Sequence, residues 1–137
     1  MIFIKKLHSI ILPLLTLIFL SGCISIWNEE KRNFETFVDI PIPEESVMDK
    51  KKTAIIGESK NWWGVLEFSI TNTVPVLFDY YKKEMRRFGW KEITFLKGET
   101  TNYSLVFSRN NRIAQIGFNF HPIEGTQIKI VMSQKTN

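Results

Sequence analysis

The chain has 137 residues, with 18 lysines and arginines against 14 aspartates and glutamates, and a formal net charge of +4. Its 44% hydrophobic content is too high for a disordered protein, and its length allows one folded core rather than two. The single cysteine excludes an intrachain disulfide framework and a cysteine-based zinc site, and two histidines leave little for metal or acid–base chemistry.

Residues 1–22 have the pattern of a secretory signal peptide. Lys5 and Lys6 precede an apolar run from Ile10 to Leu20, and small residues follow the run. The run of about 11 residues is shorter than the roughly 20 that a membrane-spanning helix needs. A membrane-anchoring helix with an incidental cysteine is the alternative interpretation.

The sequence Leu20-Ser21-Gly22-Cys23 resembles the lipobox of bacterial lipoproteins. The resemblance implies cleavage between Gly22 and Cys23, and lipidation of Cys23 by palmitate or a similar acyl chain. Cys23 would then be the mature N-terminus, and two further acyl groups would exceed the minimum for stable anchoring. The expected location is the bacterial cell envelope, with the membrane as a partner through the N-terminal lipid.

Cleavage after residue 22 of 137 would leave 115 residues and lower the net charge from +4 to +2, because Lys5 and Lys6 are removed. So small an excess of basic charge argues against nucleic acid as a partner. Ile24 follows the cysteine, at the position where an aspartate retains well-studied Gram-negative lipoproteins in the inner membrane. The resemblance therefore implies the outer membrane, facing the periplasm, if the organism is Gram-negative.

Residues 23–45 are expected to form a lipidated N-terminus and tether, and residues 46–137 a compact domain. Residues 28–32 are polar, and Pro41 and Pro43 favour an extended backbone. Helix-like spacing relates Trp27, Phe34, Phe37 and Val38, which either form a short amphipathic turn or pack on the domain or at the membrane interface.

The domain is predicted to hold one helix and about six strands in the order ββαββββ, which is an antiparallel α+β fold. Residues 62–70 alternate between apolar and other side chains, as in a strand with one buried face. Val74, Phe78, Tyr81, Met85 and Phe88 form one helical stripe, and Gly89 is expected to end the helix. Further inward positions on the later strands are Ile93, Phe95, Tyr103, Leu105, Phe107, Ala114, Ile116, Phe118, Phe120, Ile128, Ile130 and Met132.

The widths of a sheet and a helix constrain this fold. Six strands about 4.8 Å apart make a sheet roughly 25 Å wide, whereas one helix is only about 10–12 Å wide. We expect a single, strongly curved sheet that wraps around the helix. The alternatives are a flatter sheet that dimerises, or a sheet covered in part by the tether or by a second molecule.

The region 39–90 also resembles a loosely defined group of small, uncharacterised bacterial lipoproteins. The matching features are Ile40-Pro41-Ile42-Pro43, Trp63-Gly64-Val65-Leu66 and a helix that ends in Met85-x-x-x-Gly89-Trp90. The resemblance implies location and fold, and it carries over no activity.

The sequence predicts no catalytic residue, no metal site and no cofactor. His121 is followed by Pro122 in a predicted turn near Glu124, so it is a ligand or base in one interpretation and a turn residue in the other. A catalytic triad or a histidine-based metal site needs more than one such side chain. Glycine-rich phosphate loops and HExxH patterns are absent from the sequence.

Two surfaces are candidates for contact with a partner. The outer helix face carries four cations, which are either solvated or in contact with anionic lipid headgroups or an acidic partner: Lys82, Lys83, Arg86 and Arg87. The outward strand face carries apolar residues that form an interface if the strands align: Trp63, Val65, Val106, Ile113 and Val131.

The leading hypothesis is a lipid-anchored, non-enzymatic interaction or structural module that binds an envelope protein partner. The alternative is a binding domain for an apolar or lipid-like ligand, with a cavity lined by Trp62, Phe68, Tyr81 and Phe118. An envelope hydrolase ranks third, because it needs a cleft in which Glu, Asp or His121 converge.

Overall fold

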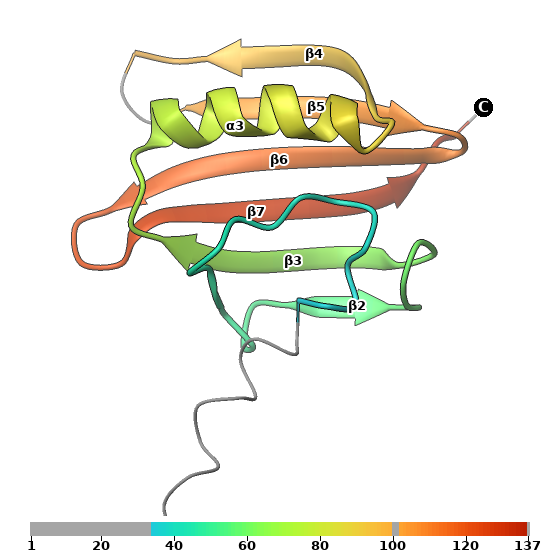
Figure 1. Cartoon of the computed structure of the whole chain (residues 1–137), viewed down its shortest axis with the longest axis horizontal. Helices are drawn as coiled ribbons and strands as arrows, with labels where there is room; N and C mark the ends of the chain where they lie inside the picture. The colour runs from blue at the N-terminus through green and yellow to red at the C-terminus, as the bar shows by residue number, and fades with distance from the viewer. Residues whose placement is uncertain (1–33, 100–101, 137) are drawn as a thin grey trace, which may run out of the picture. The chain divides into compact units, whose positions relative to one another are not determined.

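The computed structural model describes residues 34–99 and 102–136. In these residues the chain forms a single antiparallel sheet with one helix packed on one face, called the inner face (Figure 1). The elements are β1 (Val47–Met48), β2 (Ala54–Ile56), β3 (Trp63–Ile70), α3 (Val74–Arg87), β4 (Lys91–Lys97), β5 (Tyr103–Arg109), β6 (Arg112–His121) and β7 (Gly125–Gln134). The α+β class and the order ββαββββ are confirmed, with the two-residue β1 as an additional strand. The signal peptide, the lipobox and Cys23 lie outside the described residues.

The strand order β1-β3-β7-β6-β5-β4, with β2 also paired to β3, explains where the helix lies. Strands β4 to β7 follow one another as hairpins, whereas β3 pairs with β7. The connection from β3 to β4 must therefore cross the sheet, and α3 makes this crossing and packs on β4, β5 and β6 (Figure 1). The part of the inner face formed by β3 is left for another segment to cover.

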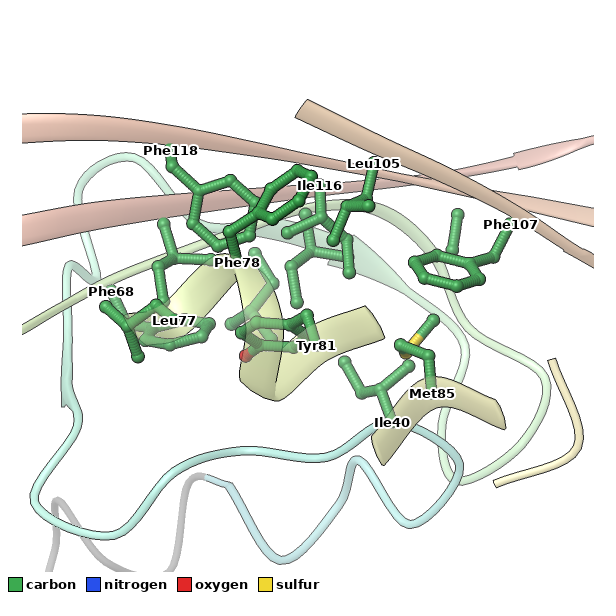
Figure 2. Packing of buried hydrophobic residues seen from close by; sticks show 14 of the residues in the cluster. Ile40, Phe68, Leu77, Phe78, Tyr81, Met85, Leu105, Phe107, Ile116 and Phe118 are labelled. Atoms are coloured by element: carbon green, nitrogen blue, oxygen red, sulfur yellow. The ribbon is translucent and has the colours of Figure 1, made fainter. Parts of the chain in front are cut away.

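The N-terminal segment Phe34–Pro41 covers that part of the inner face. Phe37 and Ile40 are buried in the core, and Figure 2 draws Ile40 in the same cluster as Met85 of the helix. The Phe34 ring lies 5.6 Å from that of Phe68, and the Phe37 ring lies 5.1 Å from that of Trp62. The domain boundary predicted at residue 46 is therefore wrong, since the folded core includes residues as early as Phe34, twelve positions before it.

The helix ends are close to the prediction. Thr73 is the N-cap, although its side chain makes no capping hydrogen bond, and Pro75 lies in the first turn. Gly89 takes φ +84°, and the N–H of Trp90 donates to the carbonyl of Met85 over 3.0 Å, which closes the helix with a left-handed cap. Phe88 is the C-cap residue and is 37% exposed, so its predicted place in the buried stripe is wrong.

Strand alternation correctly predicts the inner residues of the central strands. Leu66, Leu105, Ile116 and Ile130 are all fully buried and occupy one row across β3, β7, β6 and β5. The helix packs on β5 and β6 and the segment Phe34–Pro41 packs on β3, so both ends of this row are covered on the inner face, and alternation with a period of two is reliable there.

Three predicted inward residues are exposed, because they lie at the margins of the sheet: Ile93 (54%), Phe95 (51%) and Phe120 (54%). The pairing of β4 with β5 shifts between Glu92 and Thr94, which interrupts the alternation at Ile93. Phe95 keeps contact with the helix, since its ring lies 6.1 Å from that of Phe78 and 3.8 Å from the Lys82 ammonium.

Candidate functional site

The face of the sheet opposite α3, called the outer face from here on, is the candidate binding surface. Within residues 34–99 and 102–136, the helix and the segment Phe34–Pro41 both pack on the inner face. The five apolar residues predicted to point outward are all partly buried on strands of this sheet: Trp63, Val65, Val106, Ile113 and Val131.

The strand register brings only some of these five residues together. Val65 and Val131 are direct cross-strand partners and form a contiguous apolar pair in the middle of the sheet. Gln115 lies between Val131 and Val106 in the same row. Ile113 is paired with Ser133 and Ser108 in the next outward-facing row.

Trp63 is the first residue of β3 and lies next to the buried core. The centre of its ring is 5.5 Å from the Arg112 guanidinium, and Trp63 packs against the core cluster. Its cross-strand partner Ile56 is 78% exposed. The apolar part of the outer face therefore centres on Val65 and Val131, with Trp63 and Ile56 at one margin.

A groove of about 490 Å³ crosses the outer face beside these apolar residues. Its floor and walls follow one row of the register, in which Glu67, Lys129, Gly117, Ser104 and Leu96 are successive cross-strand neighbours on five strands. The rest of the lining is Asn102, Tyr103, Phe118, Asn119, Gln127 and Ile128. The groove is not predicted from the sequence, and Gly117 in the middle of a predicted strand is the signal that could have indicated it.

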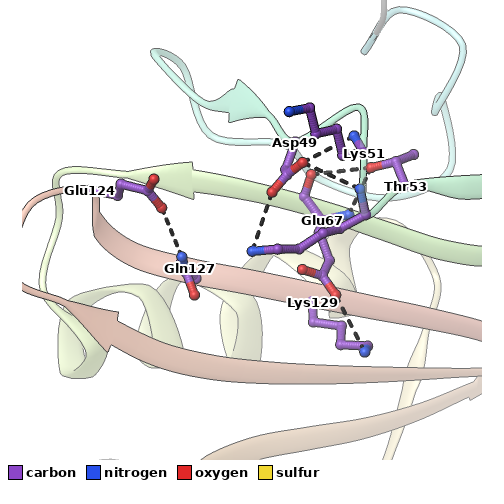
Figure 3. Close-up of polar contacts among 8 residues, drawn as sticks. Asp49, Lys51, Thr53, Glu67, Glu124, Gln127 and Lys129 are labelled. Carbon is purple, nitrogen blue, oxygen red and sulfur yellow. Dashed lines mark hydrogen bonds and ion pairs between the residues drawn. The ribbon is translucent and has the colours of Figure 1, made fainter.

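Charges at the groove are paired (Figure 3). The Lys129 ammonium lies 3.3 Å from the Glu67 carboxylate, and the Gln127 amide donates to Glu124 over 2.8 Å. The backbone of Glu67 both donates to and accepts from the hydroxyl of Thr53, which fixes this end of the groove against the chain before β2. The wall that holds Glu67 and Lys129 is thus ordered and carries no net charge.

The basic helix face is partly neutralised, since two carboxylates pair with three of its four cations. Lys82 and Arg86 both pair with Glu92, at 3.4 and 3.0 Å, and Arg87 pairs with Glu84 at 3.1 Å. Only Lys83 of the four cations has no charged partner among the described residues. Paired cations attract an anionic surface less than free ones do, so this face carries a weaker positive potential than its sequence suggests.

A buried ion pair fastens the N-terminal segment to the sheet. The Arg112 guanidinium donates to the Asp39 carboxylate, whose side chain is fully buried. Trp62 Nε1 donates to the same carboxylate over 3.1 Å, and Trp90 Nε1 donates to the Asp39 carbonyl over 2.7 Å. Asp39 falls in the predicted extended tether and the sequence gives no signal at Arg112, so this cluster is not predicted.

The structure supports the turn interpretation of His121. Its Nδ1 accepts hydrogen bonds from the backbone N–H groups of Ile123 and Glu124, over 3.3 and 3.2 Å. Glu124 contacts it through the backbone, while the Glu124 carboxylate accepts from Gln127. Among the described residues, no cluster of three histidine, cysteine, aspartate or glutamate side chains could hold a metal ion.

The residues proposed to line an interior cavity pack against aromatic neighbours. Trp62, Phe68, Tyr81 and Phe118 are all buried, and the rings of Tyr81 and Phe118 are 5.8 Å apart. Burial raises the pKa of Tyr81 well above its ordinary value, with a smaller contribution from Tyr80. The Tyr81 hydroxyl has no hydrogen-bond partner among the described residues, which marks it as a local cost in stability.

No family model, curated protein or solved structure matches this chain at a significant level. Over the residues that the structure describes, no helix is both long enough and apolar enough to cross a bilayer.

Proposed function

We propose that the protein is a lipid-anchored module of the bacterial envelope, which binds an envelope protein partner through its outer face and has no enzymatic activity. The anchor would be an acylated Cys23, as the lipobox resemblance implies. The observation that supports binding through the outer face is the difference in burial between the two faces of the sheet. Its inner face is buried under α3 and the segment Phe34–Pro41, while Val65 and Val131 lie together on the other face.

The length of the anchor fits a module that works near the membrane. Because the core includes Phe34, the chain between it and Cys23 is at most the ten residues 24–33, and these reach at most about 40 Å. A partner of the outer face would therefore belong to the membrane or to the layer directly next to it. We propose the outer membrane, with the domain in the periplasm, for a Gram-negative host.

The anchor is tested by fractionation of cells that express Cys23→Ala. We expect the wild-type protein to stay with membranes after a high-salt wash, and the variant to be released. A variant that remained in the washed membrane fraction would show that the lipid is not the anchor.

The binding surface is tested by two matched substitutions. Val131→Lys places a charge on the outer face, and Val76→Lys places the same charge on the helix at a residue that is 55% exposed. On native gels of detergent-solubilised envelopes, we expect the wild type and Val76→Lys to migrate in a complex, and Val131→Lys to migrate alone. Identical migration of the two variants would contradict binding through the outer face.

A further inference from the structure

Neither the backbone conformation nor a close backbone contact requires a glycine at position 117. It lies inside β6, between Ser104 and Lys129, and it is not among the residues with positive φ. A Cβ added there would meet only the Lys129 carbonyl oxygen, at 4.0 Å. By contrast, Gly64 and Gly125 have positive φ, and an added Cβ would lie 2.1 and 2.4 Å from backbone oxygens.

A glycine inside a strand weakens the sheet, and it often marks a place where a ligand approaches the backbone closely. Gly117 sits in the middle of the row that forms the groove, and the missing side chain leaves the floor open. A glycine at this position therefore lowers the stability of the sheet somewhat and leaves space on the outer face.

The groove wall has hydrogen-bonding groups that are not used within the described residues. The side chains of Asn102, Ser104 and Asn119 line the groove and make no hydrogen bond there. Amides and hydroxyls both donate and accept, so together they match a ligand that presents both kinds of group. The pairing of Glu67 with Lys129 leaves no free charge to balance a charged ligand.

We propose that the groove on the outer face binds a neutral oligosaccharide, a function beyond the protein contact proposed above. Sugar hydroxyls fit the amide and hydroxyl lining, and the apolar C–H face of a sugar ring fits Leu96, which is 58% exposed on β4. The volume of about 490 Å³ is within the range of about 300–1,000 Å³ that is typical of small-ligand sites.

Two other ligand classes fit the groove less well. An apolar ligand would remove water from the unpaired amides and hydroxyls without replacing their hydrogen bonds. An extended peptide usually joins a sheet by adding a strand at an edge, whereas this groove crosses the face of the sheet from β3 to β4.

The test is calorimetric titration of the mature lipoprotein in detergent with neutral oligosaccharides of two to four units, from the cello-, malto- and N-acetylchito- series. The decisive variant is Gly117→Val, which fills the groove with a side chain that suits a strand. The matched control is Ser108→Val, which adds a similar side chain to the outward-facing row of Ile113, outside the groove.

We expect at least one series to bind the wild type and Ser108→Val alike, and to bind Gly117→Val about tenfold more weakly or not at all. Thermal unfolding should show that Gly117→Val is as stable as the wild type or more stable, so lost binding cannot come from misfolding. Absence of binding by all three series would overturn the proposal, and so would equal binding by Gly117→Val. Neither result would bear on the protein contact tested at Val131.

Discussion

Asp39 and Arg112 are 73 residues apart in the sequence and form an ion pair inside the protein. Arg112 also donates to the carbonyls of Lys60 and Trp62, and the Trp90 ring centre lies 5.5 Å from its guanidinium. The pair therefore joins the N-terminal segment, the start of β3 and the start of β6 at one point. Since this segment leads back to the predicted lipid anchor, the pair holds the chain that follows the anchor against the sheet.

Breaking this pair should destabilise the protein strongly. Asp39→Ala leaves the Arg112 charge buried without its partner, and we expect the free energy of unfolding to fall by about 3–5 kcal/mol. The double variant Asp39→Ala/Arg112→Met should lose less than the single variant, because no unpaired charge remains. Urea unfolding followed by tryptophan fluorescence measures all three proteins.

The control for this prediction is the exposed pair of Asp49 and Lys52, at 3.3 Å. Lys52→Ala should change the free energy of unfolding by less than about 1 kcal/mol, as is typical of surface pairs. If Asp39→Ala proved as mild as Lys52→Ala, the structural role assigned to the buried pair would be refuted.

Truncation tests the revised domain boundary. A protein that starts at Phe34 keeps all of the contacts described above and should unfold in one cooperative transition. A protein that starts at residue 46 loses the burial of Phe37 and Ile40 and the partner of Arg112, together about 5 kcal/mol or more. Since domains are stable by only about 5–15 kcal/mol, we expect the shorter protein to be largely unfolded. Circular dichroism during thermal unfolding distinguishes the two, and equal midpoints would restore the boundary at 46.

The burial of Tyr81 predicts that the free energy of unfolding falls at alkaline pH. Its pKa is raised in the folded state, so the folded protein keeps the phenol proton at a pH where the unfolded chain releases it. The contribution to stability is therefore complete below the unfolded pKa of about 10 and is lost as the pH rises above it, by about 1.4 kcal/mol per pH unit. Tyr81→Phe should remove this dependence.

The same variant should be neutral or stabilising at pH 7. It deletes a buried hydroxyl that has no partner among the described residues, which is worth about 1 kcal/mol in favour of phenylalanine. Urea unfolding of both proteins at pH 7 and at pH 11 gives the comparison. If the difference in stability between the two proteins did not change with pH, the burial of the phenol in the folded state would be contradicted.

Local patterns were sufficient for most of the fold. The alternation from Trp62 to Ile70 and the helical stripe from Val74 to Met85 each report which side of an element is buried, and both predictions were correct. Alternation does not report where a sheet ends, and for this reason Phe95 and Phe120 were assigned to the interior. The widths of the sheet and the helix predict that one helix leaves part of the sheet uncovered, and cover by an N-terminal segment, one of the alternatives, is found at β3.

The missed features depend on contacts between distant parts of the chain. Asp39 follows a polar stretch and precedes two prolines, and its contacts with Arg112 and Trp62 are what make its burial tolerable. The groove requires five residues from five strands to fall in one row, and this depends on a register that is invisible in any single strand. The outward assignment of Val65 and Val131 needed only alternation, but their direct pairing needed the register.

The most direct test of the outer face as the binding surface is photo-crosslinking in living cells, with a photoreactive amino acid placed at Val131 or at Val76. Val131 lies beside Val65 on the outer face, and Val76 is exposed on the helix. We predict a discrete adduct with one envelope protein from position 131 and none from position 76. An adduct from position 76 alone, or none from position 131 in cells that make the full lipoprotein, would contradict the proposed function.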